Sequence, residues 1–358
     1  MVLVLTGCLL RSPAQSPGAD YIAYDLGYGA AYDINSDRTV AGTIVSGGLQ
    51  RAFSYNAGTI TDLGVLPGMD SSIGYAINAV GNVVGVSFSS DGSGGYPQGF
   101  RYKIDTMADI GTLGFTTHAN DINNSGIIVG ESVKNEAGFP SRAFVAVGGS
   151  LTDLGTLGGL NSGASGINSA GTIVGWADRS NGVTHAFSYS SGIMTDLSSL
   201  EPDGSSHASD INDLGVTVGW ASLDGHTRAF SYSGGTMLSL DTLGGANSLA
   251  NAVNLAGVIV GNADTSNGDT HAFVYKDGVM SDLAPFLATL GITGFSEALG
   301  INDQGDIVGS GEDATGQKHA FLLMVVPEPS AATFLTLAFG GVLISRRRNL
   351  RLAGRPRK

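Results

Sequence analysis

The chain has 358 residues, of which 55 are glycine and 14% are charged, a composition typical of many short strands joined by tight turns. Its hydrophobic content of 42% is enough for a packed core and excludes a disordered chain. The net charge is −13, and seven cations lie in the last 13 residues, so the remaining body is acidic enough to exclude nucleic acid and anionic lipid as its partners.

Residues 1–19 are predicted to be a partial signal peptide. Residues 1–10 are apolar and small residues follow at Ala14 and Ser16, as at a cleavage site, but the charged front region is missing. Cys8 is the only cysteine of the sequence, so no disulfide can form within the chain. Its context, Leu-Thr-Gly-Cys, matches a lipoprotein cleavage box, so lipidation of Cys8 is an alternative to an incidental cysteine.

Residues 20–326 contain seven copies of one pattern, a hydrophobic residue and an Asn followed by a short turn and then by Val-Gly or a close relative. The copies recur every 42 to 48 residues. A period of that length, filled with strand-like runs, is typical of a β-propeller blade. The seven residues are Asn35, Asn78, Asn123, Asn168, Asn212, Asn254 and Asn302.

One copy shows how a repeat is built. Asn168 and Gly171 stand at the first and last positions of a turn, which favours a type I turn closed by a left-handed glycine. The glycine recurs in every copy except the first, which has Arg38. The four predicted antiparallel strands of this repeat are residues 164–168, 172–176, 185–189 and 193–197.

Two further positions are small in every repeat. The fourth residue before each Asn is Ala or Gly, which predicts a crowded innermost strand that lines a channel. The glycine of each Val-Gly pair is predicted to allow close contact with a neighbouring blade. The two sets are Ala31, Gly74, Ala119, Ala164, Ala208, Ala250 and Ala298, and Gly42, Gly85, Gly130, Gly175, Gly219, Gly261 and Gly309.

The two ends of the repeat region are out of phase. An Asp-Leu strand precedes the first Asn, and nothing like it follows Phe321. We therefore predict that residues 21–27 pair with residues 319–323 and close a ring, because closure removes exposed sheet edges. A β-helix has no use for such an exchange. The ring-closing residues are Tyr24, Asp25, Leu26, His319, Ala320 and Phe321. The predicted fold is all-β: a seven-bladed β-propeller with four antiparallel strands per blade, whose N-terminal strand closes the last blade.

The repeats resemble the bacterial extracellular HAF-repeat family, named for the His-Ala-Phe found at residues 185–187, 271–273 and 319–321. The resemblance covers residues 20–323 and rests on the combined motifs rather than on the tripeptide. It implies a secreted or surface protein and no established activity.

Residues 327–358 resemble the PEP-CTERM sorting signal of Gram-negative bacteria. The signal consists of Pro327, Glu328, Pro329 and Ser330, an apolar segment at residues 331–345, and then Arg346, Arg347 and Arg348. The resemblance implies that an exosortase recognises Pro-Glu-Pro and removes the tail. The apolar segment would enter the bilayer while the arginines hold its end on the cytoplasmic side. The segment is shorter than the roughly 20 residues of a full span. An ordinary tail anchor is the alternative, and the ten residues after Arg348 depart from the family's abrupt basic ending.

No catalytic, cofactor or metal site is predicted. No Gly-x-Ser-x-Gly motif with a suitable His and Asp order occurs, and no two histidines have the spacing of zinc ligands. Asp33, Asp121 and Asp210 each stand two residues before a repeated Asn and place oxygens on one strand face. Calcium is therefore an alternative, although no Asp-rich calcium loop is present.

The residue before each Ala-Phe is polar. A cationic ring for an anionic sugar is one interpretation, but because each repeat has its own copy we favour a structural contact with the Asp of the adjacent strand. The residues are Arg51, Gln98, Arg142, His185, Arg228, His271 and His319.

Together these patterns predict an exported, non-enzymatic cell-surface or matrix protein of a Gram-negative bacterium. It is expected to be anchored transiently in the inner membrane through its tail and to bind polysaccharide or another surface protein. Systems with this sorting signal tend to accompany exopolysaccharide production, which implies a sugar ligand. The alternatives are a glycan-active lyase or glycosidase with acids at the channel mouth, and a purely structural spacer. Candidate stacking residues are Tyr96, Phe115, Phe139, Trp176 and Trp220, of which the two tryptophans are more simply explained by blade packing.

Overall fold

A computed structural model describes residues 21–93 and 95–326 of the chain. The predicted signal peptide, Cys8 and the sorting tail lie outside these residues. The described part consists almost entirely of strands, with one short helix, α1 (Ala284–Leu287), followed by a 3-10 turn at Ala288–Leu290. Among the helices of these residues, none has both the length and the apolar character needed to cross a membrane.

Five repeats each form a separate four-stranded antiparallel sheet in chain order. The second repeat forms β5 (Ser71–Ile77), β6 (Val83–Phe88), β7 (Gln98–Lys103) and β8 (Thr106–Asp109). The third forms β9 (Gly114–Ile122), β10 (Ile128–Lys134), β11 (Ser141–Val147) and β12 (Ser150–Asp153). The fourth forms β13 (Gly158–Ile167), β14 (Ile173–Arg179), β15 (Thr184–Ser190) and β16 (Ile193–Asp196). The fifth forms β17 (Ser206–Ile211), β18 (Thr217–Leu223), β19 (His226–Ser233) and β20 (Thr236–Ser239). The sixth forms β21 (Gly244–Val253), β22 (Ile259–Thr265), β23 (Thr270–Lys276) and β24 (Val279–Asp282).

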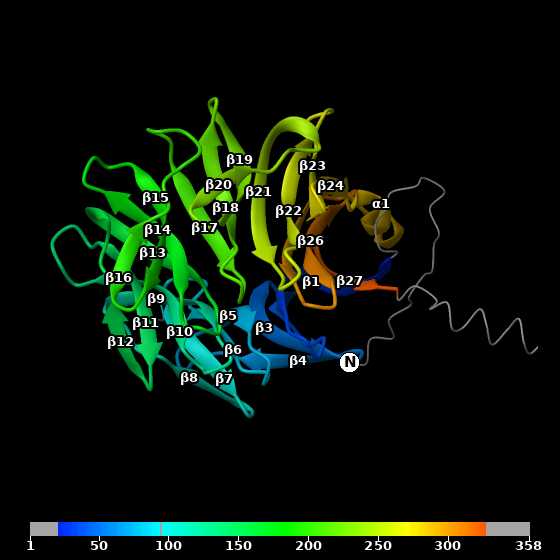
Figure 1. Cartoon of the computed structure of the whole chain (residues 1–358). Coiled ribbons are helices and arrows are strands. Elements are labelled where there is room, and N and C mark those ends of the chain that lie inside the picture. Colours follow the sequence, from blue (N-terminus) through cyan, green and yellow to red (C-terminus); the bar gives the residue numbers. More distant parts are fainter. Residues whose placement is uncertain (1–20, 94, 327–358) are drawn as a thin grey trace, which may run out of the picture.

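The first and last repeats share one seven-stranded sheet. Its order is β25 (Ile292–Ile301), β26 (Ile307–Asp313), β27 (Lys318–Val325), β1 (Tyr21–Ile34), β2 (Val40–Ser46), β3 (Leu49–Asn56) and β4 (Thr59–Gly64). The long strand β1 belongs to both halves, because residues 21–28 pair with β27 and residues 29–34 pair with β2. Figure 1 shows the sheets set around a common centre, with β1 and β27 from opposite ends of the described chain lying side by side.

The predicted contact between residues 21–27 and 319–323 corresponds to this β1–β27 pairing. Tyr24 lies opposite Leu322, and Asp25 lies opposite Phe321. A bulge follows Asp25, whose side chain accepts the N–H of Gly27 at 2.8 Å.

The turn after each repeated Asn has the predicted geometry. In the fourth repeat, the N–H of Gly171 donates to the carbonyl of Asn168 at 3.0 Å, and Gly171 is left-handed with φ of 81°. Arg38, which replaces the glycine in the first repeat, is also left-handed with φ of 61°. This prediction is confirmed.

Arg38 has a partner that explains why the first repeat departs from glycine. Its Nε lies 2.7 Å from a carboxylate oxygen of Asp306, which is fully buried in the last repeat. The other oxygen of Asp306 accepts the N–H of Val325 at the end of β27, at 2.9 Å. This pair, here called the seam clamp, therefore ties the last repeat to the first.

The glycines of the Val-Gly pairs serve a different purpose from the one predicted. A Cβ at Gly130 would overlap the carbonyl oxygen of His118, and one at Gly309 would lie 2.6 Å from the ring of Phe321. In both cases the obstructing atoms belong to the same sheet as the glycine. Glycine is therefore needed at these positions for packing within one sheet, and the predicted close contact with a neighbouring blade stays a prediction.

The core lies between successive sheets. The Phe of every Ala-Phe pair is fully buried, and Phe187 of the fourth repeat packs in one cluster with Val129 and Leu154 of the third. Six of the small residues four positions before the Asn are alanines with no exposed surface, which confirms a crowded first strand in each repeat. The seven buried phenylalanines are Phe53, Phe100, Phe144, Phe187, Phe230, Phe273 and Phe321.

Candidate functional site

The seven repeated asparagines form a closed circle of hydrogen bonds. The side-chain amide of each donates to the backbone carbonyl of the Asn in the next repeat, at 2.9 to 3.2 Å. The circle closes because Asn302 of the last repeat donates to Asn35 of the first. Each side-chain oxygen accepts one or two N–H groups of its own turn, as Asn212 does from Leu214 and Val216. The Asn recurs in the sequence because it has a structural role in every repeat.

This circle surrounds a cavity of about 250 Å³, to which all seven repeats contribute. Each repeat supplies the hydrophobic residue, the Asn and the residue after it, and we call this the Asn end of the channel. Several of the polar side chains that follow the asparagines are themselves hydrogen-bonded. Asp213 accepts the N–H and the hydroxyl of Ser169, and Asp303 accepts the N–H of Leu255.

Asp33, Asp121 and Asp210 lie on the first strands of the first, third and fifth repeats. One oxygen of each accepts the N–H of the following residue, and the other accepts an N–H from the first strand of the next repeat at 2.8 Å. Burial raises the pKa of all three carboxyls, that of Asp210 to about 6 and that of Asp121, which also lies near the other two charges, to about 8. Within residues 21–93 and 95–326, no group of three or more His, Cys, Asp or Glu side chains is placed to hold a metal ion.

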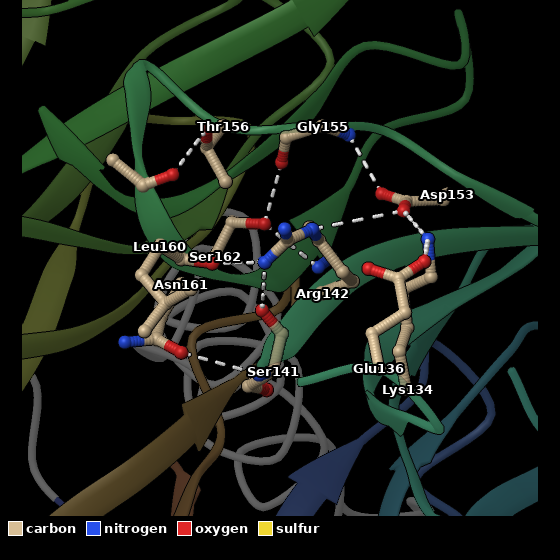
Figure 2. Close-up of polar contacts among 12 residues, drawn as sticks. Lys134, Glu136, Ser141, Arg142, Asp153, Gly155, Thr156, Leu160, Asn161 and Ser162 are labelled. Atoms are coloured by element: carbon tan, nitrogen blue, oxygen red, sulfur yellow. Dashed lines mark hydrogen bonds and ion pairs between the residues drawn. The ribbon is translucent and has the colours of Figure 1, made fainter. Parts of the chain in front are cut away.

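The residue before Ala-Phe contacts the adjacent Asp in four repeats. In three of them a histidine Nδ1 lies 2.8 to 3.0 Å from the Asp, and in the fourth the Nε of Arg142 lies 3.7 Å from Asp153. Figure 2 shows Arg142 between Asp153 and the carbonyl groups of Ser141 and Leu160. The predicted structural contact is confirmed there. Gln98 differs, since its amide donates to the carbonyl of Tyr96 at 3.2 Å. The three histidine pairs are His185–Asp196, His271–Asp282 and His319–Asp25.

A serine six residues before the Asn links successive sheets, and the sequence analysis missed it. The hydroxyl of Ser162 accepts the N–H of Ala143 in the preceding repeat at 2.9 Å and donates to the carbonyl of Gly155 at 2.6 Å (Figure 2). The available signal was the recurrence of a hydroxyl residue at this position in six of seven repeats. The serines that accept the same bond are Ser72, Ser162, Ser206, Ser248 and Ser296.

The other end of the channel is built from positions that differ between repeats. The fifth residue before each Asn pairs across the strands with the eighth residue after it, roughly 16 Å from the Asn turn at 3.3 Å per residue. We call these pairs, together with the third residue before each Asn, the variable end. The pairs are Ala30–Thr43, Ile73–Val86, His118–Glu131, Gly163–Trp176, His207–Trp220, Leu249–Asn262 and Glu297–Ser310.

The variable end gathers aromatic rings across neighbouring repeats. His207 is stacked between Trp176 and Trp220, with ring centroids 6.1 and 5.9 Å apart and interplanar angles of 24° and 8°. Burial lowers the pKa of His207 to about 4, so its imidazole is neutral at pH 7. A Cβ at Gly163 would lie 2.6 Å from the indole nitrogen of Trp176 and 3.0 Å from a carboxylate oxygen of Glu131. Glycine there leaves room for both side chains.

A second aromatic group lies on the same face of the molecule. Tyr96 lies between β6 and β7, Phe115 lies at the start of β9, and Phe139 lies between β10 and β11. These connections are at the strand ends remote from the Asn turns. The ring centroids of Tyr96 and Phe115 are 5.0 Å apart and those of Phe115 and Phe139 are 5.6 Å apart, both edge to face. Tyr96 is 55% exposed and Phe139 is 64% exposed. We call these three residues the aromatic platform.

Comparisons with known proteins identify the architecture. No protein-family model matches the chain, and no curated protein does. Among solved structures, the β-propeller domain of the Trilobed protease from Pyrococcus furiosus is 11% identical, with 83% of this chain and 93% of that one covered and a TM-score of 0.53. The structure of YCF48 bound to D1 peptide is 11% identical, with 89% and 99% covered and a TM-score of 0.51.

A puromycin-hydrolyzing peptidase from Mycobacterium tuberculosis is 13% identical, with a TM-score of 0.49. The match covers 83% of this chain but 56% of that protein, so the chain spans little more than half of its length. At such identities the similarities show the fold alone. The chain has an all-β fold of the β-propeller type, supported by the first two matches.

Proposed function

We propose that the chain is a seven-bladed β-propeller that binds a ligand at its variable end and catalyses no reaction. In this proposal the seven-stranded sheet is two blades joined through β1, which adds to the five separate sheets. The circle of seven asparagines supports this count, because each donates to its successor and the last donates to the first. Closure leaves no unpaired sheet edge at the seam.

The observation that carries the binding function is where the repeats differ. Residues that serve the fold recur in nearly every repeat, as the asparagines, the buried phenylalanines and the bridging serines do. A residue that does not recur is free of that shared structural demand. Histidine, tryptophan and glutamate occupy the variable end only in some repeats, and side chains that vary in this way on a rigid scaffold favour ligand recognition.

The rest of the proposal concerns export. The chain is a surface or matrix protein of the HAF-repeat type that binds polysaccharide or another surface protein, and its PEP-CTERM tail is removed by an exosortase after a transient inner-membrane stage. The Pro327–Ser330 motif, the apolar segment and the three arginines support this. Intact-mass measurement of the exported product tests it, since a product that keeps its arginine-rich end contradicts processing.

A surface glycan-active enzyme is the second candidate. Two acids at the variable end, Glu131 and Glu297, have no counterpart in the other repeats, as a pair of catalytic carboxylates would require. Glu297 is bound by Lys318 at 3.0 Å and Ser310 at 2.8 Å, which favours a structural role for it. Release of reducing sugar from a bound glycan, abolished in Glu131→Gln, would establish the enzyme.

A glycan array probed with the full chain tests the binding function. Trp176→Ala at the variable end should remove the signal, and Leu255→Ala should preserve it, because Leu255 is an exposed apolar residue at the Asn end. If the array is negative, the same two variants are compared for capture of surface proteins by the immobilised chain. Equal behaviour of the two variants contradicts a site at the variable end.

A further inference from the structure

We propose that the aromatic platform, Tyr96, Phe115 and Phe139, is a stacking site for an uncharged polysaccharide chain. This inference rests on the proposed binding function, specifies the ligand class, and adds three residues on the same face of the molecule to those of the variable end.

The exposed rings form a flat apolar surface that contributes little to the stability of the fold. Phe115 makes edge-to-face contacts with both of the other rings. Both outer rings keep more than half of their surface exposed. Their exposed area therefore adds little to folding and is available to a ligand.

Phe139 also has an unfavourable backbone. Its φ is 49°, a left-handed conformation that costs a residue with a Cβ about 1 kcal/mol or more. The turn itself would accept Gly or Asn at lower cost. Because the ring is mostly exposed, burial offsets little of that cost. A binding role would account for an exposed aromatic side chain in this conformation.

The loop that carries Phe139 is braced before any ligand arrives. Its ends are joined by the N–H of Lys134 donating to the carbonyl of Pro140, and the N–H of Phe139 donates to the carbonyl of Glu136, both at 3.0 Å. Figure 2 shows Lys134 beside Glu136 and Asp153, with Nζ–oxygen distances of 2.6 and 3.1 Å. A ring held in place in this way loses little conformational entropy when it binds.

Gly114 brings the second ring up to the same loop. It pairs with Lys134, and a Cβ at Gly114 would overlap the backbone nitrogen of Asn135. A larger residue would push β9 away from the loop and separate Phe115 from Phe139. The platform is thus assembled by the close approach of two backbones.

The charge and size of the site select the ligand class. Apart from the last 13 residues the chain has 11 cations against 31 acids, and the nearby Lys134 is already shared by two carboxylates. Anionic polymers are therefore disfavoured. A stable protein interface needs about 800 Å² per partner with an apolar centre, whereas three rings with a polar rim form a small patch. The apolar C–H face of a pyranose fits such rings, and its hydroxyls suit the rim.

Calorimetric titration of the full chain with cellohexaose and laminarihexaose tests the proposal, with trigalacturonate as the charged comparison. Wild-type chain should bind at least one uncharged hexasaccharide and should not prefer trigalacturonate. Phe139→Asn should weaken that binding by about tenfold. The same variant should keep or raise the thermal midpoint, because Asn tolerates a left-handed backbone. Phe139→Tyr retains the ring and should bind as wild type does.

The outcomes separate this inference from the function on which it rests. If Phe139→Asn binds the hexasaccharide normally while Trp176→Ala does not, the variable end binds the ligand and the platform is not the site. Preference for trigalacturonate, or no binding of either hexasaccharide at millimolar concentration, overturns the platform proposal. Capture of a surface protein that depends on Trp176 would still sustain the broader function.

Discussion

The two ends of the channel are made from the same hairpins but follow opposite rules. At the Asn end every repeat contributes the same side chain, and each asparagine bonds to the next repeat. At the variable end, the fifth residue before the Asn changes from Ala30 to His118, Gly163 and Glu297. Positions that are identical in all repeats thus make the bonds that stabilise the fold. Positions that vary between repeats do not share that structural role, and they are the ones available to bind a ligand.

The seam clamp is an exception at the Asn end, because Arg38 and Asp306 differ from the residues at the same positions of the other repeats. The clamp replaces a glycine and a neutral residue by Arg38 and Asp306, yet both serve closure rather than binding. A residue that differs between repeats but bonds to another repeat, as Arg38 does, has a structural role. A residue that differs and leaves an aromatic ring exposed is a candidate for ligand binding.

Breaking the seam clamp should cost the most. Arg38→Gly restores the residue of the other repeats but leaves the carboxylate of Asp306 buried without its cation, so we expect a loss of about 3 kcal/mol in unfolding free energy. Adding Asp306→Val, the residue at the equivalent positions 216 and 258, should recover most of that loss. Urea unfolding of both variants measures this, and a double variant no better than the single one contradicts the clamp.

Breaking the circle of asparagines should have the next largest effect. Asn168→Ala removes the amide that binds Asn212 and the oxygen that accepts the N–H of Thr172, which should cost about 2 kcal/mol. The matched control is Asn262→Ala at the variable end, for which the expected change is about 0.5 kcal/mol or less. Equal losses of unfolding free energy in the two variants would contradict a structural difference between the two ends.

The channel aspartates between the two ends should make stability depend on pH. The folded pKa of Asp121 is raised to about 8 from an ordinary value of 3.8, so its contribution to stability is complete below about pH 4 and is lost as the pH rises through 8. Unfolding free energy should therefore fall between pH 5 and pH 9. Asp121→Ala, which copies Ala76 of the second repeat, should reduce that fall. An unchanged pH profile in the variant would show that Asp121 is ionised without penalty.

The smallest expected effect is spectroscopic. The chain has two tryptophans, and both flank His207, so indole fluorescence reports on the variable end. Because burial lowers the pKa of His207 to about 4, emission should stay constant from pH 7 to 5 and be quenched with a midpoint near 4. The stability associated with the neutral ring is present above pH 6.5 and is lost as the pH falls towards 4. A midpoint near 6.5 would mean that the imidazole is accessible to water.

Much of the fold follows from the sequence because repetition multiplies a weak signal. The Asn turn, the Ala-Phe strand and the unmatched Asp-Leu strand predict the hairpins and the pairing of the chain ends. What they do not predict are contacts between repeats. That Asn168 donates to Asn212, or that Ser162 accepts from Ala143, depends on how successive sheets are placed in space.

The candidate site was less predictable for the same reason. Tyr96, Phe115 and Phe139 stand out as aromatic residues, but their mutual contact depends on two hairpin loops and on Gly114. Trp176 and Trp220 were interpreted as blade packing, and they do pack on His207 across two neighbouring repeats, but the sequence does not identify that partner. The need for glycine within the sheet at Gly130 and its counterparts was not predicted, because the sequence does not show which atoms lie over a glycine.

Hydrogen–deuterium exchange of the full chain, with and without cellohexaose or laminarihexaose, tests the division between the two ends most directly. The account predicts protection at the starts of β9, β13 and β17 and in the β6–β7 and β10–β11 connections, with the Asn turns unchanged. Protection concentrated at the turns that follow Asn35 and its counterparts would place the ligand at the end assigned to structure and contradict the account.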